Sequence, residues 1–424
     1  MKKIKVGIVG AGTVGAGLAE ILSKERQSIL RKTGLDIELS AVCDKNTALK
    51  EKFPDVRFVS DYNDLVSDPS VSVIAELIGG KTVAYDVVKA ALAAGKTVVT
   101  ANKALLSEKG EELFAIAEEN GIEIGFEASV GGTIPVIRSI RTSLAANQFD
   151  AVYGILNGTT NFILTKMEEE HLEYSSALKE AQRLGFAEAD PSFDVEGIDA
   201  AHKLSILIGL AFERRLPISE IAVEGITNIS KTEIETAASL GYKIKLLGIA
   251  KRHGNAIEAS VRPAMVPFSH PISGIRNEMN AVYMETDYSG PLLFSGKGAG
   301  SLPTASAVVS DIIFYGSRLG SESGYEKNLY PKAEAVPETE RTEKFYIRFE
   351  AKDQPGVLGE ITSVLGRNNI SIATLHQKEI QSRSAEIIMI THPGLEKNLR
   401  KSMDEITKAG CLARPPVVLR LQEN

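Results

Sequence analysis

A glycine-rich turn after the first apolar segment limits most strongly what this chain can fold into. Residues 4–9 are rich in β-branched side chains and predict a strand. The turn that follows consists of Gly10, Ala11, Gly12, Thr13, Val14 and Gly15. Glycine here permits a tight turn, lets backbone N–H groups approach a pyrophosphate and lets the next helix pack against the strand. The turn predicts dinucleotide binding at a helix N-terminus; a purely structural glycine turn is the alternative.

Strand and helix patterns alternate over the first part of the chain. Strands are predicted at residues 4–9, 39–42, 73–77, 97–99 and 122–126, and amphipathic helical stretches at 14–30, 83–94 and 108–120. Apolar strands that alternate with helices are typical of a parallel sheet covered on both faces. We therefore predict an α/β fold in which residues 1–130 form a Rossmann-type doubly wound parallel sheet that binds the dinucleotide.

The pattern changes after residue 130. Residues 131–300 mix helical and strand patterns and predict an α+β domain for substrate binding, catalysis and dimerisation. Pro303 opens a helix at 304–315, and we expect residues from about 300 to 318 to return to the first domain. Gly, Ser, Pro, Lys and Glu dominate residues 319–343, which are typical of a linker.

Regular patterns resume at the C-terminal end. Strands are predicted at residues 345–351, 370–376, 385–391 and 417–421, and helices at 357–368 and 396–409. The order βαββαβ predicts a ferredoxin-like domain at residues 344–424.

Composition narrows the class of protein. A formal net charge of -7 argues against a nucleic-acid partner. The two cysteines, Cys43 and Cys411, lie far apart without metal spacing, so neither a disulfide framework nor a zinc site is expected. The sequence has no run of about 18 apolar residues, so we predict no membrane span. We expect a cytoplasmic protein.

The second strand ends in Asp44 and Lys45. An acidic residue at this place accepts a hydrogen bond from a ribose 2′-hydroxyl and favours NAD, whereas a lysine can pair with the 2′-phosphate of NADP. Asp44 could also simply cap a turn. The sequence therefore leaves the choice between NAD and NADP open, and our hypothesis is that Asp44 makes NAD usable.

Polar and glycine residues follow two further strands. Ligands of open α/β sheets bind outside the carboxyl ends of the strands. Gly79 and Gly80 allow close backbone approach there, while Thr100, Asn102 and Lys103 place an amide and an ammonium beside the expected nicotinamide. For Lys103 alone, a solvated surface lysine is the alternative.

A carboxylate-rich segment at residues 188–203 leads into an apolar stretch at 204–210. Asp199 and Lys203 are four residues apart and share one face of a helix. They could form a surface ion pair, but a lysine held against an apolar body loses affinity for its proton. Such a lysine suits general acid–base chemistry between an alcohol and a carbonyl.

Two turns are candidates for ligand contacts. Residues 154–162 end a strand in a hydroxyl-rich turn with Gly158 and Thr159, which offers groups for a small polar ligand but is also ordinary turn chemistry. Residues 296–300, ending in Gly300, form a second glycine-rich helix start that could lie against the cofactor.

Four of these segments together resemble homoserine dehydrogenase: TANK (100–103), GILNGTTNF (154–162), EADPSFDVEGIDAAHK (188–203) and GKGAGSLPT (296–304). The resemblance covers about residues 1–320. It implies NAD(P)H-dependent, reversible reduction of L-aspartate 4-semialdehyde to L-homoserine, within threonine, methionine and isoleucine biosynthesis, by a homodimer or homotetramer.

The resemblance also implies residue roles. Lys203 matches the family's acid–base lysine and Lys103 its second active-site lysine. Glu188 and Asp199 match carboxylates that engage the substrate's amino group or order the site, and Asp194 is a secondary candidate. Two lysines in one pocket are expected to lower each other's pKa. The segment that matches the family's monovalent-cation site (Na+ or K+) contains Glu127, Val130, Gly132 and Ile134.

The C-terminal domain resembles the ACT domain, which binds amino acids at paired-domain interfaces. Asp353, Gly356, Val357 and Leu358 form a strand-to-helix turn whose free N–H groups can meet a carboxylate. The resemblance implies an amino-acid effector, typically threonine in this family. A dimerisation module without a ligand is the alternative.

Two other functions compete with this interpretation. Another amino-acid oxidoreductase on a Rossmann core, such as an aspartate or saccharopine-type dehydrogenase, would not be expected to carry the segments at 154–162 and 188–203. A catalytically silent, NAD-bound sensor would have no need of both lysines and the acidic cluster.

Overall fold

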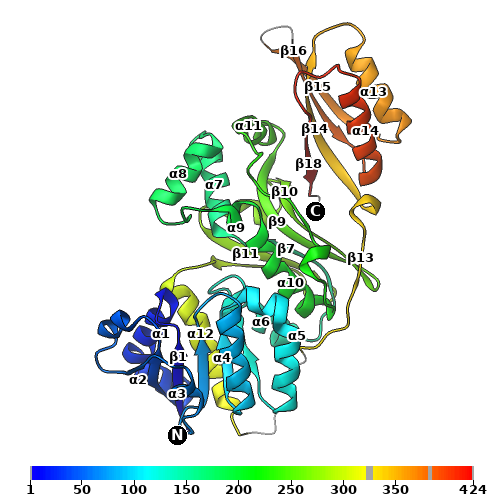
Figure 1. Ribbon diagram of the computed structural model, residues 1–424. Helices are drawn as coiled ribbons and strands as arrows, with labels where there is room; N and C mark the ends of the chain where they lie inside the picture. Colours follow the sequence, from blue (N-terminus) through cyan, green and yellow to red (C-terminus); the bar gives the residue numbers. More distant parts are fainter. Residues whose placement is uncertain (1, 321–327, 381–383, 423–424) are drawn as a thin grey trace.

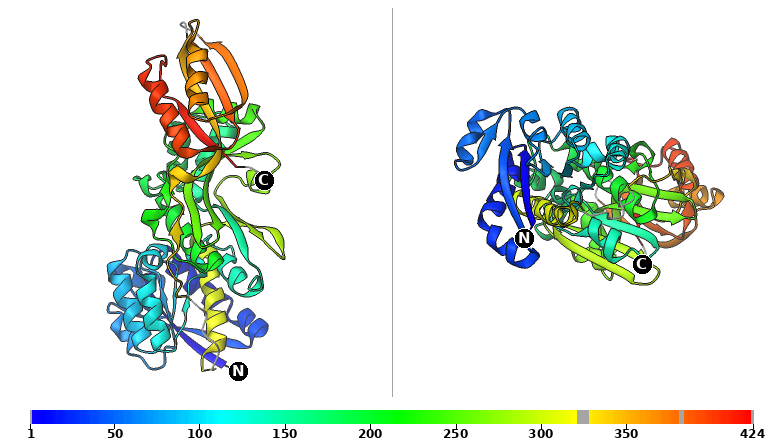
Figure 2. Two further views of the ribbon diagram at one scale, coloured as in Figure 1. Left: turned by 90° about the vertical axis from the view of Figure 1, so that its right-hand side faces the viewer. Right: turned by 90° about the horizontal axis from the view of Figure 1, so that it is seen from below.

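The computed structural model describes residues 2–320, 328–380 and 384–422. Three units follow one another along the molecule: the N-terminal sheet lies at one end, a large mixed sheet in the middle and the C-terminal unit at the other end (Figures 1 and 2). Among the described residues, no helix is long and apolar enough to cross a membrane.

The N-terminal sheet has six parallel strands in the order β3-β2-β1-β4-β5-β6. They are β1 (Lys2–Val9), β2 (Leu35–Cys43), β3 (Arg57–Val59), β4 (Val73–Glu76), β5 (Thr97–Thr100) and β6 (Ile124–Gly125). Helices α3 (Asn63–Val66), α4 (Thr82–Ala93) and α5 (Lys103–Glu119) connect successive strands. This order confirms the Rossmann-type sheet, and the strand order reverses between β1 and β4, where such sheets bind their ligands.

The helices of this unit differ from prediction at their ends. Residues 14–30 form two helices, α1 (Thr13–Lys24) and α2 (Arg26–Thr33), instead of one. The break falls in a charged stretch without apolar residues, where Arg26 turns away to pair with Asp36 of β2 at 2.7 Å. Helix α5 begins five residues early because the Asn102 side chain caps it by accepting from the Leu105 N–H.

Helix α12 (Ser301–Arg318) returns to the N-terminal sheet and packs along α1, β5 and β6. It starts at Gly300, whose φ of +124° favours glycine. The Ser301 hydroxyl donates to the Thr13 carbonyl at 2.7 Å, so the second glycine-rich turn lies against the first.

The middle sheet is built on long antiparallel strands: β7 (Phe149–Ile155), β9 (Tyr242–His253), β10 (Ala256–Pro267), β11 (Met279–Thr286) and β12 (Gly290–Lys297). Short β8 (Ala222–Val223) pairs with β10. Helix α10 (Ile198–Phe212) packs on β7, β9 and β10 and on α5 of the N-terminal unit. The remaining helices are α6 (Val136–Arg138), α7 (Gly158–Glu169), α8 (Tyr174–Arg183), α9 (Ser192–Val195) and α11 (Lys231–Ser239).

The C-terminal unit has the predicted βαββαβ order. Its elements are β14 (Thr342–Lys352), α13 (Val357–Arg367), β15 (Ile372–Ile380), β16 (Ser384–Thr391), α14 (Glu396–Lys408) and β18 (Val417–Leu421), with a short β17 (Gly394–Leu395) beside β14. The strand order is β18-β14-β16-β15. The sequence did not indicate that β18 also pairs with β10, so that one sheet runs through the middle and C-terminal units.

The segment that leads to the C-terminal unit is attached to the middle unit. Residues 321–327 of the predicted linker lie outside the described residues. Beyond them, the Arg215 N–H donates to the Pro331 carbonyl at 2.9 Å and the Ala333 N–H donates to Arg215 at 2.8 Å. The short β13 (Glu334–Ala335) then pairs with β10. The connecting segment is therefore hydrogen-bonded to the loop that follows α10.

Candidate active site

A crevice of about 830 Å³ opens at the carboxyl ends of β1, β4 and β5. It is lined by Val14, residues 76–80, residues 101–104 and Phe193. A Cβ on Gly10 would lie 2.5 Å from the Leu77 carbonyl, and one on Gly15 would lie 1.9 Å from the Gly10 oxygen, so both positions require glycine. Nothing lies within 4 Å of the Cβ position of Gly12. The turn therefore has the tight glycines and the open position that a pyrophosphate needs.

Asp44 lies against the glycine-rich turn. One carboxylate oxygen accepts from the Ala11 N–H at 2.8 Å and the other from the Asn46 N–H at 2.9 Å. Lys45 is exposed next to it. The Asp44 carboxylate is thus fixed beside the glycine-rich turn by two backbone hydrogen bonds.

The floor of the crevice depends on Glu76, which sequence reasoning missed. Its buried carboxylate ends β4 and accepts from the Thr100 hydroxyl at 2.7 Å and the Ile78 N–H at 2.9 Å. Burial raises the pKa of Glu76. The Asn102 amide donates to the Gly80 carbonyl at 2.6 Å, so the two predicted strand-end segments are tied together. The sequence signal that could have identified Glu76 is a glutamate at the end of an otherwise apolar strand.

Asp199 joins the two predicted lysines. The Lys203 ammonium is 2.7 Å from Asp199 Oδ2 and donates to the Leu156 carbonyl at 2.6 Å. The Lys103 ammonium, at the start of α5, is 2.9 Å from Asp199 Oδ1. Asp199 is 3% exposed and Lys203 8% exposed. The ion pair between Asp199 and Lys203 is therefore buried, and the alternative of a surface ion pair is wrong.

The two lysines differ in their electrostatics. Burial lowers the pKa of Lys203, the Asp199 carboxylate opposes this effect, and the nearby Lys103 charge lowers it further. Burial alone would lower the pKa of Lys103 as well, but the charge and hydrogen bond of Asp199 outweigh it and raise the pKa. The expectation that both lysines have lowered pKa values is therefore wrong for Lys103. The Lys103 side chain is 33% exposed and that of Lys203 only 10%, so desolvation penalises the charged form of Lys103 less.

Asn157 organises the carboxylates and was also missed. Its side-chain NH2 group donates to Asp194 at 2.7 Å and to Asp199 at 2.9 Å. Its side-chain oxygen caps α7 by accepting from the Thr160 N–H. Burial is the main cause that raises the pKa of Asp194, and the Asp199 charge adds to it. The Thr159 hydroxyl donates to the Phe186 carbonyl at 2.6 Å. The two hydrogen bonds of the Asn157 amide join residues 37 and 42 positions apart, so local sequence patterns do not reveal them.

The remaining predicted residues lie at different distances from this cluster. A Cβ on Gly158 would lie 2.6 Å from the Glu278 carbonyl, so glycine lets the start of α7 approach that loop. Glu188 is exposed, and its carboxylate has no ion pair or hydrogen bond among the described residues. A Cβ on Gly298 would lie 2.1 Å from buried Asn280, whose amide donates to the same Leu156 carbonyl as Lys203. The 296–300 turn therefore contacts the lysine site as well as the cofactor turn.

The predicted cation-binding residues share one buried loop. The Glu127 carboxylate accepts from the Ile137 and Arg138 N–H groups at 2.8 and 2.9 Å, and its own N–H donates to Asp311. Burial, with the Glu127 charge, raises the pKa of Asp311 to about 7. Each Glu127 carboxylate oxygen thus already accepts a backbone hydrogen bond, and the backbone carbonyl oxygens of the loop are further candidate ligands for a cation. Gly132 has a φ of +58° and would bring a Cβ within 2.6 Å of Gly298, so the loop packs on the 296–300 turn.

The predicted effector turn is at the start of α13. Asp353 and Gly356 are exposed, and Gly356 adopts a left-handed conformation with φ +93° at the helix N-cap. Val357 and Leu358 are half-buried and pack on the core of the C-terminal unit.

The crevice, the glycine-rich turn and the paired lysines define a nicotinamide-dependent oxidoreductase. Family models match over three stretches: "Homoserine dehydrogenase, NAD binding domain" at residues 10–127, "Homoserine dehydrogenase" at 135–313 and "ACT domain" at 345–411. A homoserine dehydrogenase from Neisseria gonorrhoeae is 40% identical over 431 residues, which cover 100% of this chain and 99% of the relative.

Solved structures of homoserine dehydrogenases also match this chain. The homoserine dehydrogenase from Thiobacillus denitrificans has a TM-score of 0.94 and 39% identity, over 100% of this chain and 99% of that one. A hyperthermophilic archaeal homoserine dehydrogenase in complex with NADPH has a TM-score of 0.64 and 26% identity, over 75% of this chain and 98% of that one. The chain belongs to the homoserine dehydrogenase family and is an NAD(P)-dependent oxidoreductase with a C-terminal ACT domain.

Proposed function

We propose that Lys203 and Lys103, joined by Asp199, carry the proton and oxygen chemistry in the reversible reduction of L-aspartate 4-semialdehyde to L-homoserine. The observation that supports this is the single buried carboxylate shared by both ammonium groups at the mouth of the cofactor crevice. The nicotinamide, when bound in the crevice, supplies or accepts the hydride.

The two lysines take different parts. Lys203, with its lowered pKa, exchanges a proton with the substrate oxygen through a water molecule. Lys103, with its raised pKa, stays cationic and polarises that oxygen. Asp199 has both oxygens engaged and orders the site, whereas exposed Glu188 is available for the substrate's amino group. Asp194, Thr159 and Gly158 complete the substrate pocket beside Asn157.

Asp44 is the residue that we propose to accept a hydrogen bond from the ribose 2′-hydroxyl of NADH. The wild-type enzyme is then expected to use NADH with a kcat/KM within about tenfold of that for NADPH, and Asp44→Asn to lose about 10- to 100-fold with NADH alone, since a hydrogen bond to a charged group contributes roughly 1.5–3 kcal/mol. Initial rates at 340 nm with both dinucleotides measure this. Lys45→Ala is the matched variant and should affect NADPH alone. A strong NADPH preference of the wild-type enzyme would contradict the role of Asp44.

Threonine is the effector that we propose for the ACT domain, acting in a homodimer or homotetramer. Two physical connections support coupling: β18 extends the sheet of β10, and the connecting segment is hydrogen-bonded to Arg215, shortly after the end of α10, the helix of Lys203. Activity is expected to fall about fivefold or more as L-threonine rises through the millimolar range. D-threonine serves as the control, and a flat response to the L-isomer would contradict the proposal.

The buried loop that contains Glu127, Val130, Gly132 and Ile134 is our proposed site for Na+ or K+, bound through backbone carbonyls. Because this loop packs on the 296–300 turn, loss of the ion should loosen the turn and lower kcat. Assays in sodium or potassium chloride are expected to be faster than assays in choline chloride at equal ionic strength. Equal rates in all three salts would argue against the site.

A further inference from the structure

The helices that carry the two lysines are joined by a second contact, one turn beyond Asp199. On α5, Ser107 lies four residues after Lys103; on α10, His202 lies three residues after Asp199. These spacings put each pair on one face of its helix. The Ser107 hydroxyl oxygen is 2.6 Å from His202 Nδ1. Lys103–Asp199 and Ser107–His202 are therefore successive polar contacts between the same two helices.

His202 is enclosed by groups that matter to the site. It is 6% exposed, directly precedes Lys203 and has its ring 5.7 Å from that of Phe193, a wall of the cofactor crevice. Burial lowers the pKa of His202, so the ring is neutral near neutral pH, and its Nδ1 shares a hydrogen bond with the Ser107 hydroxyl. The side chain thus connects α10 to α5 without touching either lysine's ammonium group.

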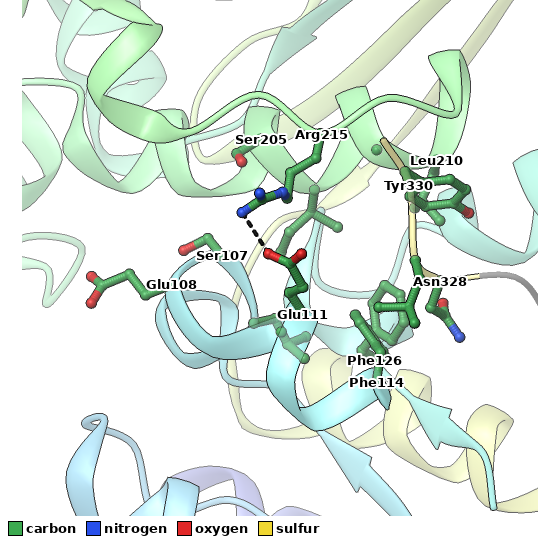
Figure 3. A pocket seen from close by; sticks show the side chains of 15 residues that line it. Ser107, Glu108, Glu111, Phe114, Phe126, Ser205, Leu210, Arg215, Asn328 and Tyr330 are labelled. Atoms are coloured by element: carbon green, nitrogen blue, oxygen red, sulfur yellow. Dashed lines mark ion pairs between the residues drawn. The ribbon is translucent and has the colours of Figure 1, made fainter. Parts of the chain in front are cut away.

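A pocket opens between the two helices on the far side of this contact. It is lined by Ser107, Gly110 and Phe114 of α5 and by Ser205 and Gly209 of α10. Figure 3 shows Ser107 at this cavity, the Arg215–Glu111 ion pair across its mouth and Tyr330 of the connecting segment at its side. Both side chains of that ion pair are about half exposed, and Arg215 lies beyond the end of α10, so the pair contributes little to holding α10 against α5.

We propose that Ser107 and His202 form a hydrogen-bonded clamp that sets the spacing of α5 and α10 and so holds Lys103 and Lys203 on the shared Asp199 carboxylate. Both are positioning residues for the reaction. The inference rests on the proposed roles of the lysines. Because the clamp acts on the reacting groups and not on the glycine-rich turn, its loss should lower kcat by a larger factor than it raises the KM for the dinucleotide.

The test uses the full-length enzyme with four single variants and one double variant. Ser107→Ala and His202→Leu remove the hydrogen bond and are each expected to lower kcat about tenfold, since small misplacements of reacting groups can cost up to about 100-fold. Ser107→Thr keeps a hydroxyl and His202→Asn keeps an acceptor near the Nδ1 position, so both should restore most of kcat. The double variant Ser107→Ala/His202→Leu should be no slower than either single variant, because both remove one interaction.

Ser205→Ala is the matched control, since Ser205 lines the same cavity but bonds only to the Leu216 carbonyl among the described residues. Its kcat should equal that of the wild-type enzyme. Wild-type kcat in Ser107→Ala, multiplicative losses in the double variant, or no rescue by Ser107→Thr and His202→Asn would each overturn the clamp. Lys203→Ala is assayed alongside: if it retains turnover the proposed lysine roles fail, whereas its loss of turnover with unaffected clamp variants rejects the clamp alone.

Discussion

Lys203→Ala is expected to lower kcat by about 10²- to 10⁴-fold while leaving dinucleotide affinity nearly unchanged. Removal of a positioned general acid–base group has this magnitude. The Lys203 ammonium lies between Asp199 and the Leu156 carbonyl, away from the glycine-rich turn that would hold the pyrophosphate. Initial rates at 340 nm give kcat, and titration of NADPH fluorescence gives the affinity.

Lys24→Ala is a suitable control for the loss of a lysine, because Lys24 pairs only with Glu20 on the exposed face of α1 among the described residues. It should turn over at the wild-type rate. Near-wild-type turnover of Lys203→Ala would remove Lys203 from the mechanism. A loss of turnover with an equal loss of NADPH affinity would indicate a damaged cofactor site instead.

Asp199→Asn should lose activity to a comparable extent and also destabilise the protein. The substitution leaves two ammonium groups beside each other without an anion, and breaking a buried ion pair costs about 3–5 kcal/mol. Because Lys103 is one-third exposed, water screens part of this cost and we expect about 3 kcal/mol. Urea unfolding measures the loss, with Asp190→Asn, on the exposed part of the same segment, as the control.

The stability that Asp199 contributes depends on pH. Burial would raise the pKa of Asp199, but Lys203 and Lys103 together hold it well below its usual value. The stabilising effect is therefore complete above the unfolded pKa of about 3.9 and is lost as pH falls towards the folded pKa. Wild-type stability should fall on acidification, and that of Asp199→Asn should fall less.

In the proposed mechanism, neutral Lys203 accepts the proton during homoserine oxidation, so the rate should rise as pH passes the pKa of Lys203. The Asp199 charge keeps that pKa higher than burial alone would, so the rising limb of Asp199→Asn should lie at lower pH. If the rising limb of the pH–rate profile lies at the same pH in Asp199→Asn as in the wild-type enzyme, Asp199 does not influence the titrating group.

Much of the fold and part of the candidate site follow from local sequence. The glycine-rich turn predicted the cofactor crevice because Gly10, Gly12 and Gly15 meet steric demands within one strand–turn–helix unit. The four-residue spacing of Asp199 and Lys203 predicted their contact because helix geometry alone brings them together. The βαββαβ pattern likewise predicted the C-terminal unit, since each strand and helix carries its own periodicity.

Other features depend on contacts between distant segments. Asn157 reaches Asp194 and Asp199 only because β7 delivers the start of α7 beside α10, and Lys103 reaches Asp199 only because α5 packs on α10 across two units. Glu188, although part of the same segment, remains at the surface. The pairing of β18 with β10 joins two sheets that no local pattern connects.

Sequence alone therefore determined the type of each unit, the cofactor turn and the Asp199–Lys203 pair, because backbone periodicity and glycine sterics act over a few residues. Only the tertiary structure decided that the pKa of Lys203 is lowered and that of Lys103 raised. That difference arises from burial and from the sharing of one carboxylate, and both depend on how α5 and α10 pack.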